Sequence, residues 1–522
     1  RNNRKSELLY HEAEWLAAMA NWLGAPYPRE QLNQGWEMIL LNQFHDILPG
    51  SSIGLVYEDC ARDYARIREL GEGVRSRALQ TLAMSANVPG RGVLVYNPTS
   101  WARDDVATLD LGEQGPLQAV DAEGNRRPLQ ALRNGRYLLD ARAVPAYGYA
   151  VYTLEPAPEP AKASTLAVSE QALENRFFRV QLNERGEIAS LYDKERGREV
   201  LPAGVVANEW QAFDDRPRTT MDAWDINTDY EEKRYPLTKP ATVCVIEQGP
   251  LRAGVEVRRP LLNSALVQRI YIYEAVPRID FQTEIEWQEK HVLLKVAFPV
   301  DVHAEQATYE IQFGNLQRPT HRNTSWDAAR FEVPAHKWAD LSEGDYGVSL
   351  LNDCKYGYDA QDNTLRLTVL RSPASPDPHA DEGHHELTYA LYPHGGDWRH
   401  GTVQQAYALN LPLGTTMVEP HGGMLPPRWS LVTCSADHVV IETVKVAEDA
   451  EELILRLYEC YNQRGRVTLH FGLPVKGVYA CNLIEDGAEP LPLDGNQVTL
   501  DIKPYQVRAI KVRLARSRSC GG

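Results

Sequence analysis

The sequence predicts an α + β multidomain protein in which an N-terminal antiparallel three-helix bundle is followed by antiparallel β-sandwich domains. Residues 1–88 have the apolar spacing of helices, whereas from Val93 onward short β-rich runs alternate with turn residues. The length of 522 residues exceeds one ordinary hydrophobic core and implies several domains. Strands without intervening helical periods favour packed antiparallel sheets.

The bundle is predicted as helices over residues 6–24, 28–44 and 51–84, because apolar residues recur there at helical spacing. Pro28 suits the first turn of the second helix, and Ser51 is a good cap for the third. Short turns between three such helices indicate an antiparallel arrangement.

Three β domains and a tail are predicted to follow the bundle. A small β-sandwich covers residues 89–160, and a Pro/Ala-rich linker over 156–164 overlaps its end. A large β domain covers 165–437, and a C-terminal β-sandwich covers 438–515. The last residues, 516–522, have the composition of a disordered tail.

Charge and cysteine usage exclude several classes of protein. The net charge of −16 argues against a nucleic-acid partner or an anionic membrane, since both require a basic face. No apolar run approaches the roughly 18 residues that span a bilayer. The seven cysteines are scattered singly without a C-x-x-C, which is typical of a reducing compartment, and we expect a cytoplasmic protein.

A histidine and an aspartate stand together in LLNQFHDILPGSSIG, residues 40–54, where one predicted helix ends and the next begins. His45 could be a metal ligand, a general base or a structural residue that bonds a helix carbonyl. One histidine cannot hold a catalytic zinc ion, which needs about three protein ligands.

Acidic residues surround a tryptophan in FDDRPRTTMDAWDIN, residues 213–227. Asp222 and Asp225 flank Trp224, and carboxylates beside an aromatic ring are what a sugar site needs. The ring covers the apolar face of a pyranose while the carboxylates take its hydroxyls. A solvated acidic loop with one buried tryptophan is the alternative.

Five histidines gather between residues 371 and 400, at His379, His384, His385, His394 and His400. Their spacing fits no metal-site template, and loop histidines at the entrance of a strand are the better interpretation. The sequence has no G-x-S-x-G, no P-loop and no H-E-x-x-H, so it gives no support for a serine hydrolase, a nucleotide-binding protein or a zincin.

These stretches, with VYNPTSWAR, ENRFFRVQLNERGEIASLYDKERGREVL, FPVDV, RPTHRNTSWD and YPHGGDW, resemble the glycoside hydrolase family 38 α-mannosidases, best in their bacterial and cytosolic branch. The resemblance implies a galactose-mutarotase-like supersandwich for the large β domain and a retaining, Zn²⁺-dependent mechanism. It assigns His45 as a zinc ligand and Asp46 as a contact to substrate hydroxyls. Trp224 is the candidate aromatic residue beside the bound mannose.

One part of the family pattern has no counterpart in this sequence. The family's catalytic nucleophile and its other zinc ligands belong to an N-terminal α/β domain with a strand-end His-x-Asp, so we assign no catalytic residue here. The resemblance implies part of an α-mannosidase acting on terminal mannosyl residues of oligosaccharides or mannosides. We expect this chain to be inactive alone, to expose the bundle face that the missing domain covers, and to form a homo-oligomer.

Two other functions stay open. The chain could be a non-catalytic carbohydrate-binding protein built on mannosidase-like β domains. It could also be a self-sufficient glycosidase that uses Asp222 and Asp225 as its carboxylate pair.

Overall fold

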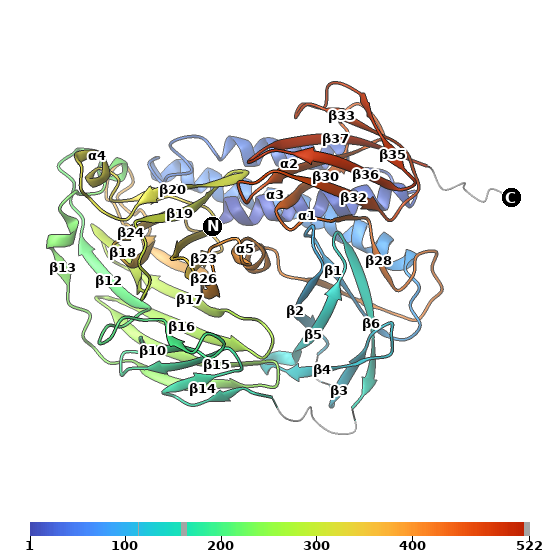
Figure 1. Cartoon of the computed structure of the whole chain (residues 1–522). Helices are drawn as coiled ribbons and strands as arrows, with labels where there is room; N and C mark the ends of the chain where they lie inside the picture. The colour runs from blue at the N-terminus through green and yellow to red at the C-terminus, as the bar shows by residue number, and fades with distance from the viewer. Residues whose placement is uncertain (113, 158–163, 516–522) are drawn as a thin grey trace. The chain divides into compact units, whose positions relative to one another are not determined.

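The computed structural model describes residues 1–112, 114–157 and 164–515 (Figure 1). The chain divides into two compact units, each built from separate stretches of sequence. The first comprises Arg1–Arg4, Leu40–Asp63 and Lys162–Asn410, and the second comprises Lys5–Ile39, Tyr64–Ala161 and Leu411–Gly522. The predicted tail and most of the predicted linker lie outside the described residues.

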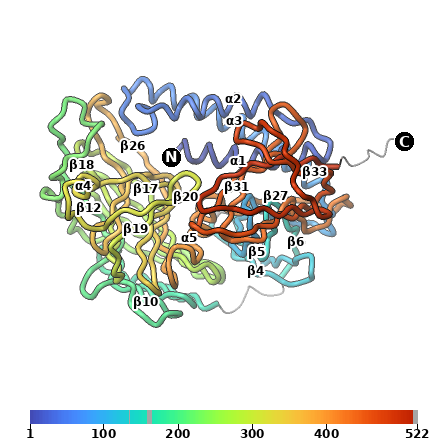
Figure 2. The backbone as a smooth tube through the Cα atoms, turned by 45° about the horizontal axis from the view of Figure 1, so that its top comes forward, coloured from blue at the N-terminus to red at the C-terminus, as the bar shows by residue number. Residues whose placement is uncertain are grey.

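The three predicted helices are present as α1 (Asn2–Trp22), α2 (Arg29–Leu41) and α3 (Gly54–Ser85). They run side by side in both Figures 1 and 2. In the second unit, the hydroxyl of Tyr10 donates to the carbonyl of Ile67 at 3.0 Å, and its ring meets Trp36 edge-on. A Cβ at Gly35 would lie 1.7 Å from the Tyr10 hydroxyl oxygen, so close helix packing requires glycine there.

Two helix ends differ from the prediction. The first helix begins at Asn2 rather than at Ser6. Ser6 is an interior residue of the helix, and it is buried. The second ends at Leu41 rather than Phe44, so the segment with His45 is a series of turns. Helix ends are hard to place from local sequence, because tertiary contacts as well as helix propensity decide where a helix begins and ends.

The second unit holds three antiparallel sheets. The first has the order β2-β5-β4-β3-β6-β1-β27, with β28 also paired to β6, and the others have the orders β29-β32-β36-β35 and β30-β31-β37-β33-β34. The strands are β1 (Gly92–Asn97), β2 (Arg103–Asp110), β3 (Leu117–Val120), β4 (Arg126–Ala131), β5 (Arg136–Val144), β6 (Gly148–Pro156), β27 (Gly414–Val418), β28 (Arg428–Ser430), β29 (Val432–Cys434), β30 (Val439–Val446), β31 (Leu453–Glu459), β32 (Gly465–Phe471), β33 (Val475–Cys481), β34 (Glu489–Leu491), β35 (Leu493–Asp494), β36 (Gln497–Ile502) and β37 (Val507–Leu514). A 3₁₀ turn, η1 (Arg133–Gly135), precedes β5.

The first unit also holds three antiparallel sheets. Their orders are β14-β15-β16-β17-β26-β23-β22-β19-β20, β13-β12-β18-β25-β24-β21 and β11-β10-β9-β8-β7. The strands are β7 (Ala167–Val168), β8 (Ala172–Glu174), β9 (Phe178–Leu182), β10 (Ile188–Asp193), β11 (Arg198–Glu199), β12 (Glu209–Asp214), β13 (Arg234–Tyr235), β14 (Thr242–Gln248), β15 (Arg252–Leu261), β16 (Ser264–Tyr273), β17 (Ile279–Trp287), β18 (Val292–Pro299), β19 (Gln306–Ile311), β20 (Gly314–Pro319), β21 (Val333–Pro334), β22 (Trp338–Ser342), β23 (Tyr346–Asn352), β24 (Gly357–Gln361), β25 (Thr364–Leu370) and β26 (Gly383–Gly395). Short helical elements are η2 (Asp222–Trp224), η3 (Tyr230–Glu232), α4 (Ser325–Ala328) and α5 (Thr402–Asn410).

The two larger sheets of the first unit pack face to face. Phe281 of β17 and Tyr389 of β26 stack at a centroid distance of 5.0 Å, and both rings contact Phe298 of β18 in the other sheet. Alternating residues of both sheets supply a continuous apolar core, as in a β-sandwich. This architecture confirms the predicted α + β fold with antiparallel β-sandwiches.

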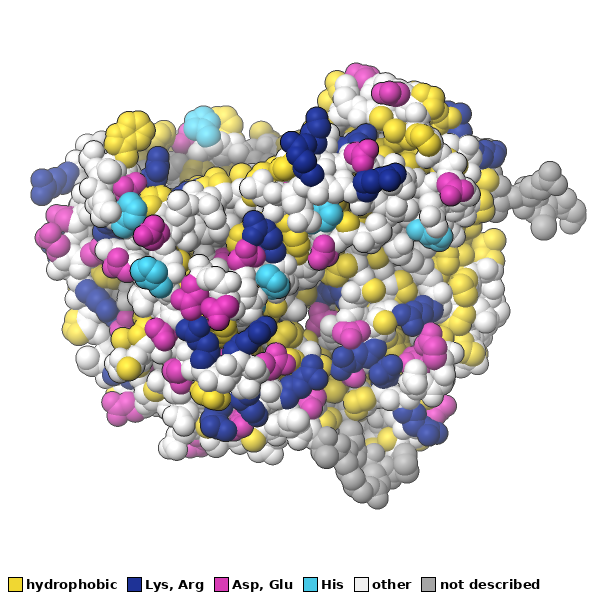
Figure 3. Space-filling view, viewed as in Figure 1, with side chains coloured by type: hydrophobic (Ala, Val, Ile, Leu, Met, Phe, Trp, Pro, Cys, Tyr) yellow, Lys and Arg dark blue, Asp and Glu magenta, His cyan; other side chains and the backbone are white. Residues whose placement is uncertain are grey.

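Charged side chains of both signs are interspersed on the face drawn in Figure 3. In the part of the chain that the structure describes, no helix is long and apolar enough to cross a membrane.

Candidate functional site

The His45–Asp46 pair lies in the turns between α2 and α3, within the first unit. The side chain of His45 is 71% exposed, and its Nε2 lies 3.2 Å from Oδ2 of Asp46. Phe44 packs against the imidazole at a centroid distance of 4.3 Å. These turns between α2 and α3, which we call the His45 corner, therefore present a nitrogen and a carboxylate oxygen side by side to solvent.

Asp46 is fixed by contacts within the same corner. The hydroxyl of Ser51 donates to Oδ1 of Asp46 at 3.1 Å, and the hydroxyl of Tyr57 donates to the Asp46 carbonyl at 3.2 Å. The backbone N–H of Ser52 donates to the same tyrosine oxygen. Ser51 thus serves to hold Asp46, a role that differs from the predicted helix cap, because α3 begins only at Gly54.

Several large apolar side chains near the pair in sequence are exposed. They are Leu40, Leu41, Phe44, Leu48, Ile53 and Leu55, and we call them the apolar rim. Six exposed large apolar side chains thus fall within sixteen residues of sequence.

A second segment, the loop over residues 371–382, approaches the corner. A Cβ placed on Gly54 would lie 3.3 Å from Oδ1 of Asp377, so this carboxylate lies against the first residue of α3. The helix N-terminus carries partial positive charge, which favours a carboxylate at this place.

The same loop is hydrogen-bonded to the segment that carries Trp224, and we call this set of hydrogen bonds the clasp. Asp222 accepts backbone N–H groups of Ala374 and Ser375 at 3.0 and 2.7 Å, and the N–H of Ala223 donates to the Ser375 carbonyl. The clasp therefore joins two loops that are about 150 residues apart in sequence.

Arg371 completes this clasp and was not found from the sequence. Its Nε donates to Oδ2 of buried Asp215 at 2.7 Å, and its Nη1 donates to the carbonyl of Ala223 at 2.8 Å. Its Nη2 donates to the carbonyl of Asp222. An arginine that directly follows a strand, opposite an Asp-Asp pair, is the only sequence signal for this contact.

Trp224 and its two flanking aspartates have different environments. The Trp224 side chain is exposed on η2, and Asp225 is exposed as well. Asp222 is buried, and its carboxylate is occupied by the backbone donors of the 371–382 loop. Asp222 is thus held within the fold, while the ring of Trp224 is open to solvent.

The five histidines between residues 371 and 400 do not converge. His379 contacts Glu382, His384 contacts Glu286, and His385 contacts the carbonyl of Asp381. His394 is buried against Asp340, and His400 contacts the carbonyl of Asp397. Among the described residues, no group of three histidine, cysteine, aspartate or glutamate side chains is placed to hold a metal ion. His384, His385 and His394 lie within strand β26, not in a loop as predicted, because that strand begins already at Gly383.

Three family profiles match successive parts of the chain. The alpha mannosidase middle domain matches residues 1–82, the glycosyl hydrolases family 38 C-terminal domain matches 173–379, and the family 38 C-terminal beta sandwich domain matches 438–510. The chain belongs to glycosyl hydrolase family 38.

Curated relatives match nearly the whole chain. Alpha-mannosidase 2C1 of Mus musculus is 39% identical over 98% of the chain, and an alpha-mannosidase of Saccharomyces cerevisiae is 30% identical over 92%. These alignments cover 48% and 43% of the relatives, so the chain spans about half the length of the curated relatives it matches. An alpha-mannosidase structure from Enterococcus faecalis has the same fold, with a TM-score of 0.81 at 17% identity over 98% of this chain and 66% of the other.

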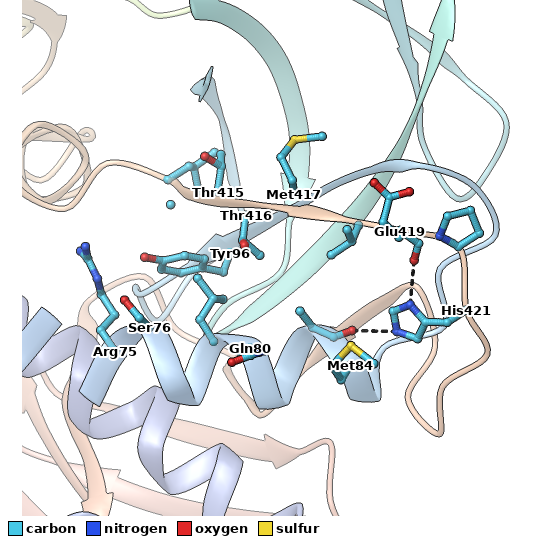
Figure 4. A pocket seen from close by; sticks show the side chains of 16 residues that line it. Arg75, Ser76, Gln80, Met84, Tyr96, Thr415, Thr416, Met417, Glu419 and His421 are labelled. Atoms are coloured by element: carbon cyan, nitrogen blue, oxygen red, sulfur yellow. Dashed lines mark hydrogen bonds between the residues drawn. The ribbon is translucent and has the colours of Figure 1, made fainter. Parts of the chain in front are cut away.

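The family 38 chain also has a groove of about 880 Å³ in its second unit, between α3 and β27 (Figure 4). Its lining includes Arg75, Tyr96 and His421, and none of the site residues predicted from the sequence. Arg75 and Tyr96 both donate to Glu12, whose pKa is raised by burial. Glu12 therefore holds the side chains of Arg75 and Tyr96 in place at the wall of the groove.

Proposed function

We propose that this chain is part of a retaining, zinc-dependent α-mannosidase that removes terminal α-mannosyl residues from oligosaccharides or mannosides. The observation that carries the proposal is the exposed His45–Asp46 pair, held by Ser51 and Tyr57 in a family 38 chain. The position of Trp224 on a loop that is clasped to the 371–382 segment supports it, because Asp377 of that segment lies at the start of α3.

The donor set of the corner fits part of a zinc site. His45 Nε2 is a suitable nitrogen ligand, and Asp46 Oδ2 is a neighbouring oxygen donor at 3.2 Å. A zinc ion would supply Lewis acidity beside the sugar hydroxyls. The remaining ligands and both catalytic carboxylates would come from sequence beyond these 522 residues, consistent with relatives about twice as long.

The chain's own side chains would bind and orient the mannosyl unit. The Asp46 carboxylate would accept hydrogen bonds from sugar hydroxyls, and its fixed geometry would lower the entropic cost of placing the sugar. The exposed indole of Trp224 would cover the apolar face of the pyranose and exclude water there.

The apolar rim would be covered by the rest of the protein. Its side chains lie close in sequence to the one zinc ligand that we assign to this chain, so a domain that completes the zinc site would also bury the rim. We propose on the same basis that the isolated 522-residue chain hydrolyses no mannoside detectably. The single, scattered cysteines, of which the six described ones are free, support a cytoplasmic location.

The test compares His45→Ala with wild type in the full-length protein, by zinc content per mole of protein and by hydrolysis of 4-nitrophenyl α-mannoside. We expect His45→Ala to lose zinc and to lower kcat/KM by about 100-fold or more, and Asp46→Asn to lower it about 10- to 100-fold. His400→Ala, which removes another exposed histidine of the first unit, is the matched control. Normal zinc content and turnover in His45→Ala contradict the proposal.

A further inference from the structure

The groove between α3 and β27 has a helix for one wall and a strand for the other (Figure 4). The strand contributes every residue from Gly414 to Val418, and the groove continues along the chain to His421. The helix contributes one face, because its lining residues recur at three- or four-residue spacing. They are Arg75, Ser76, Leu79, Gln80, Ala83 and Met84.

Residues from both faces of β27 line the groove. Consecutive side chains of a strand point to opposite faces. In Figure 4 the side chain of Thr416 points toward α3, whereas those of Thr415 and Met417 lie on the other side of the strand. The Thr415 hydroxyl donates to the carbonyl of Thr108 in β2 at 2.9 Å, which holds it there. A groove over one face would be lined by alternate residues, so this groove runs along the edge of the strand.

The strand β27 is the last strand of its sheet. Within the described part of the chain it pairs with β1 alone. In an antiparallel ladder, successive residues direct both their N–H and C=O groups first to one neighbouring strand and then to the other. An edge strand therefore leaves the backbone groups of every second residue without a ladder partner.

The hydrogen bonds of β1 identify which residues of β27 are left in this way. The N–H of Leu154 in β6 donates to the carbonyl of Arg91, directly before β1, at 2.9 Å. Arg91 therefore faces β6. Because the ladder alternates, the residues of β1 that direct their backbone groups toward β27 are Gly92, Leu94 and Tyr96.

The register pairs these three residues with Val418, Thr416 and Gly414, so Thr415 and Met417 direct their N–H and C=O groups to the free edge. No hydrogen bond joins these four backbone groups to any other described residue. Two donors and two acceptors, carried by residues two positions apart on a strand, match the backbone of a second extended chain. The free edge of β27 is thus a place for one more strand.

The walls of the groove are joined at both of its ends. At one end, Nε2 of His421 lies 3.1 Å from the carbonyl oxygen of Ala83, which ties the segment after β27 to the last turns of α3 (Figure 4). At the other end, Glu12 accepts from both Arg75 of α3 and Tyr96 of β1. A groove that is already formed spares its ligand the free-energy cost of opening it.

The side chains of the groove favour an uncharged segment. Its charged residues Arg75 and Glu419 lie toward its two ends in Figure 4, and both are already paired with other residues of the chain. Between them the lining is hydroxyl, amide and apolar, and Met84 and Met417 are 62% and 39% exposed. Methionine adapts to apolar partners of varied shape, whereas a charged side chain placed here would lose hydration without gaining a partner.

We propose that this groove binds an extended, uncharged segment of a partner protein, which adds as a strand to the free edge of β27. The backbone groups of Thr415 and Met417 exchange hydrogen bonds with the segment. Alternate apolar side chains of the segment pack against Leu79 and Met84 of α3. The proposal is independent of the mannosidase activity, because no residue of the groove belongs to the His45 corner or to the clasp.

The test measures binding of a fluorescein-labelled peptide amide, Val-Thr-Val-Thr-Val, to the full-length protein by fluorescence anisotropy. We expect saturable binding to wild type. Met417→Pro removes an N–H at the free edge, where a strand tolerates proline, and should weaken binding about tenfold. Met417→Ala removes the side chain but keeps the N–H, and as the matched control it should change the affinity by less than about threefold.

Two further peptides need no variant of the protein, so they decide the proposal even if Met417→Pro does not fold. The same peptide N-methylated at every residue keeps its side chains but has no N–H to donate, and it should bind wild type about tenfold more weakly or less. The peptide Glu-Thr-Glu-Thr-Glu should not bind, because its charges find no partner in the groove.

Three outcomes overturn the proposal. The first is no saturable binding of Val-Thr-Val-Thr-Val to wild type. The second is equal affinity for this peptide and either of the two further peptides. The third is a homodimer in sedimentation that Met417→Pro converts to a monomer, because a second copy of the chain then occupies the edge of β27.

Discussion

Asp46 and Asp222 are the same residue type in two loops of one unit, and each has a histidine nitrogen beside its Oδ2, but they differ in exposure and in their other hydrogen-bond donors. The Asp46 side chain is 30% exposed, with one oxygen bonded to Ser51 and the other beside an exposed histidine. The Asp222 side chain is 9% exposed, two backbone N–H groups donate to its carboxylate, and its Oδ2 lies 3.1 Å from Nδ1 of His291. A buried carboxylate whose lone pairs are used by the backbone stabilises the fold, and a partly exposed one can take a ligand.

Lys295 carries a charge that is used entirely within the fold, because its fully buried ammonium group pairs with the carboxylates of Asp359 and Glu332. Lys295→Met would leave Glu332 without its cation and buried Asp359 with Arg366 alone, and we expect a loss of about 3–5 kcal/mol in the free energy of unfolding. Urea denaturation measures it. Lys239→Met, at an exposed lysine, is the control and should change stability by less than about 0.5 kcal/mol. Equal effects of the two changes contradict the assignment.

Asp222→Ala breaks the clasp and should have the next largest effect. The N–H groups of Ala374 and Ser375 lose their acceptor, which costs about 1–3 kcal/mol. The fluorescence of exposed Trp224 should change as its loop loosens. Asp225→Ala alters the exposed neighbour and is the matched control. If Asp225→Ala destabilises the protein more than Asp222→Ala does, the structural role of Asp222 is wrong.

Glu231 is expected to have a smaller effect on the free energy of unfolding, and only at acidic pH. Burial opposes its ionisation, but hydrogen bonds from Arg322 and Arg366 outweigh this and lower its pKa to about 2. The unfolded chain has the ordinary pKa of about 4.3, so stability from Glu231 is complete above that pH and is lost as pH falls toward about 2. The urea midpoint of Glu231→Gln should therefore fall less steeply than that of wild type below about pH 4.5. Glu232→Gln, at the exposed neighbour, should keep the wild-type slope.

Asp46→Asn should have the smallest effect on stability. Asn keeps an oxygen acceptor for the Ser51 hydroxyl, and the site is partly exposed, so we expect a change within about 0.5 kcal/mol. The same change should weaken activity in the full-length protein. A loss of stability as large as that of Asp222→Ala would place Asp46 among the structural carboxylates.

The three helices and the antiparallel sheets could be predicted because their signals are local. Apolar spacing defines α1 to α3, and alternating patterns define the strands. His45 was correctly placed beyond the second helix, but the helix end was predicted at Phe44, three residues after Leu41, where the N–H groups of Gln43 and Phe44 begin turn hydrogen bonds to Leu40 and Leu41.

The clasp around Asp222 could not be predicted because its partners are distant in sequence. Nothing near Asp222 indicates that Ala374 and Ser375 supply its donors, or that Arg371 reaches Asp215. From the sequence alone, Asp222 and Asp225 look equivalent on the two sides of Trp224. Their difference in burial arises only when the 371–382 loop folds over one of them.

The first unit is assembled from stretches that leave the ribosome at different times. Residues 40–63, with His45 and the apolar rim, are synthesised long before the sheets over 162–410 to which they belong. Until residue 377 emerges, the N-terminal end of α3 lacks its carboxylate neighbour. The first unit can therefore complete its native contacts only after residue 410 has been synthesised, and contacts so distant in sequence favour slow folding.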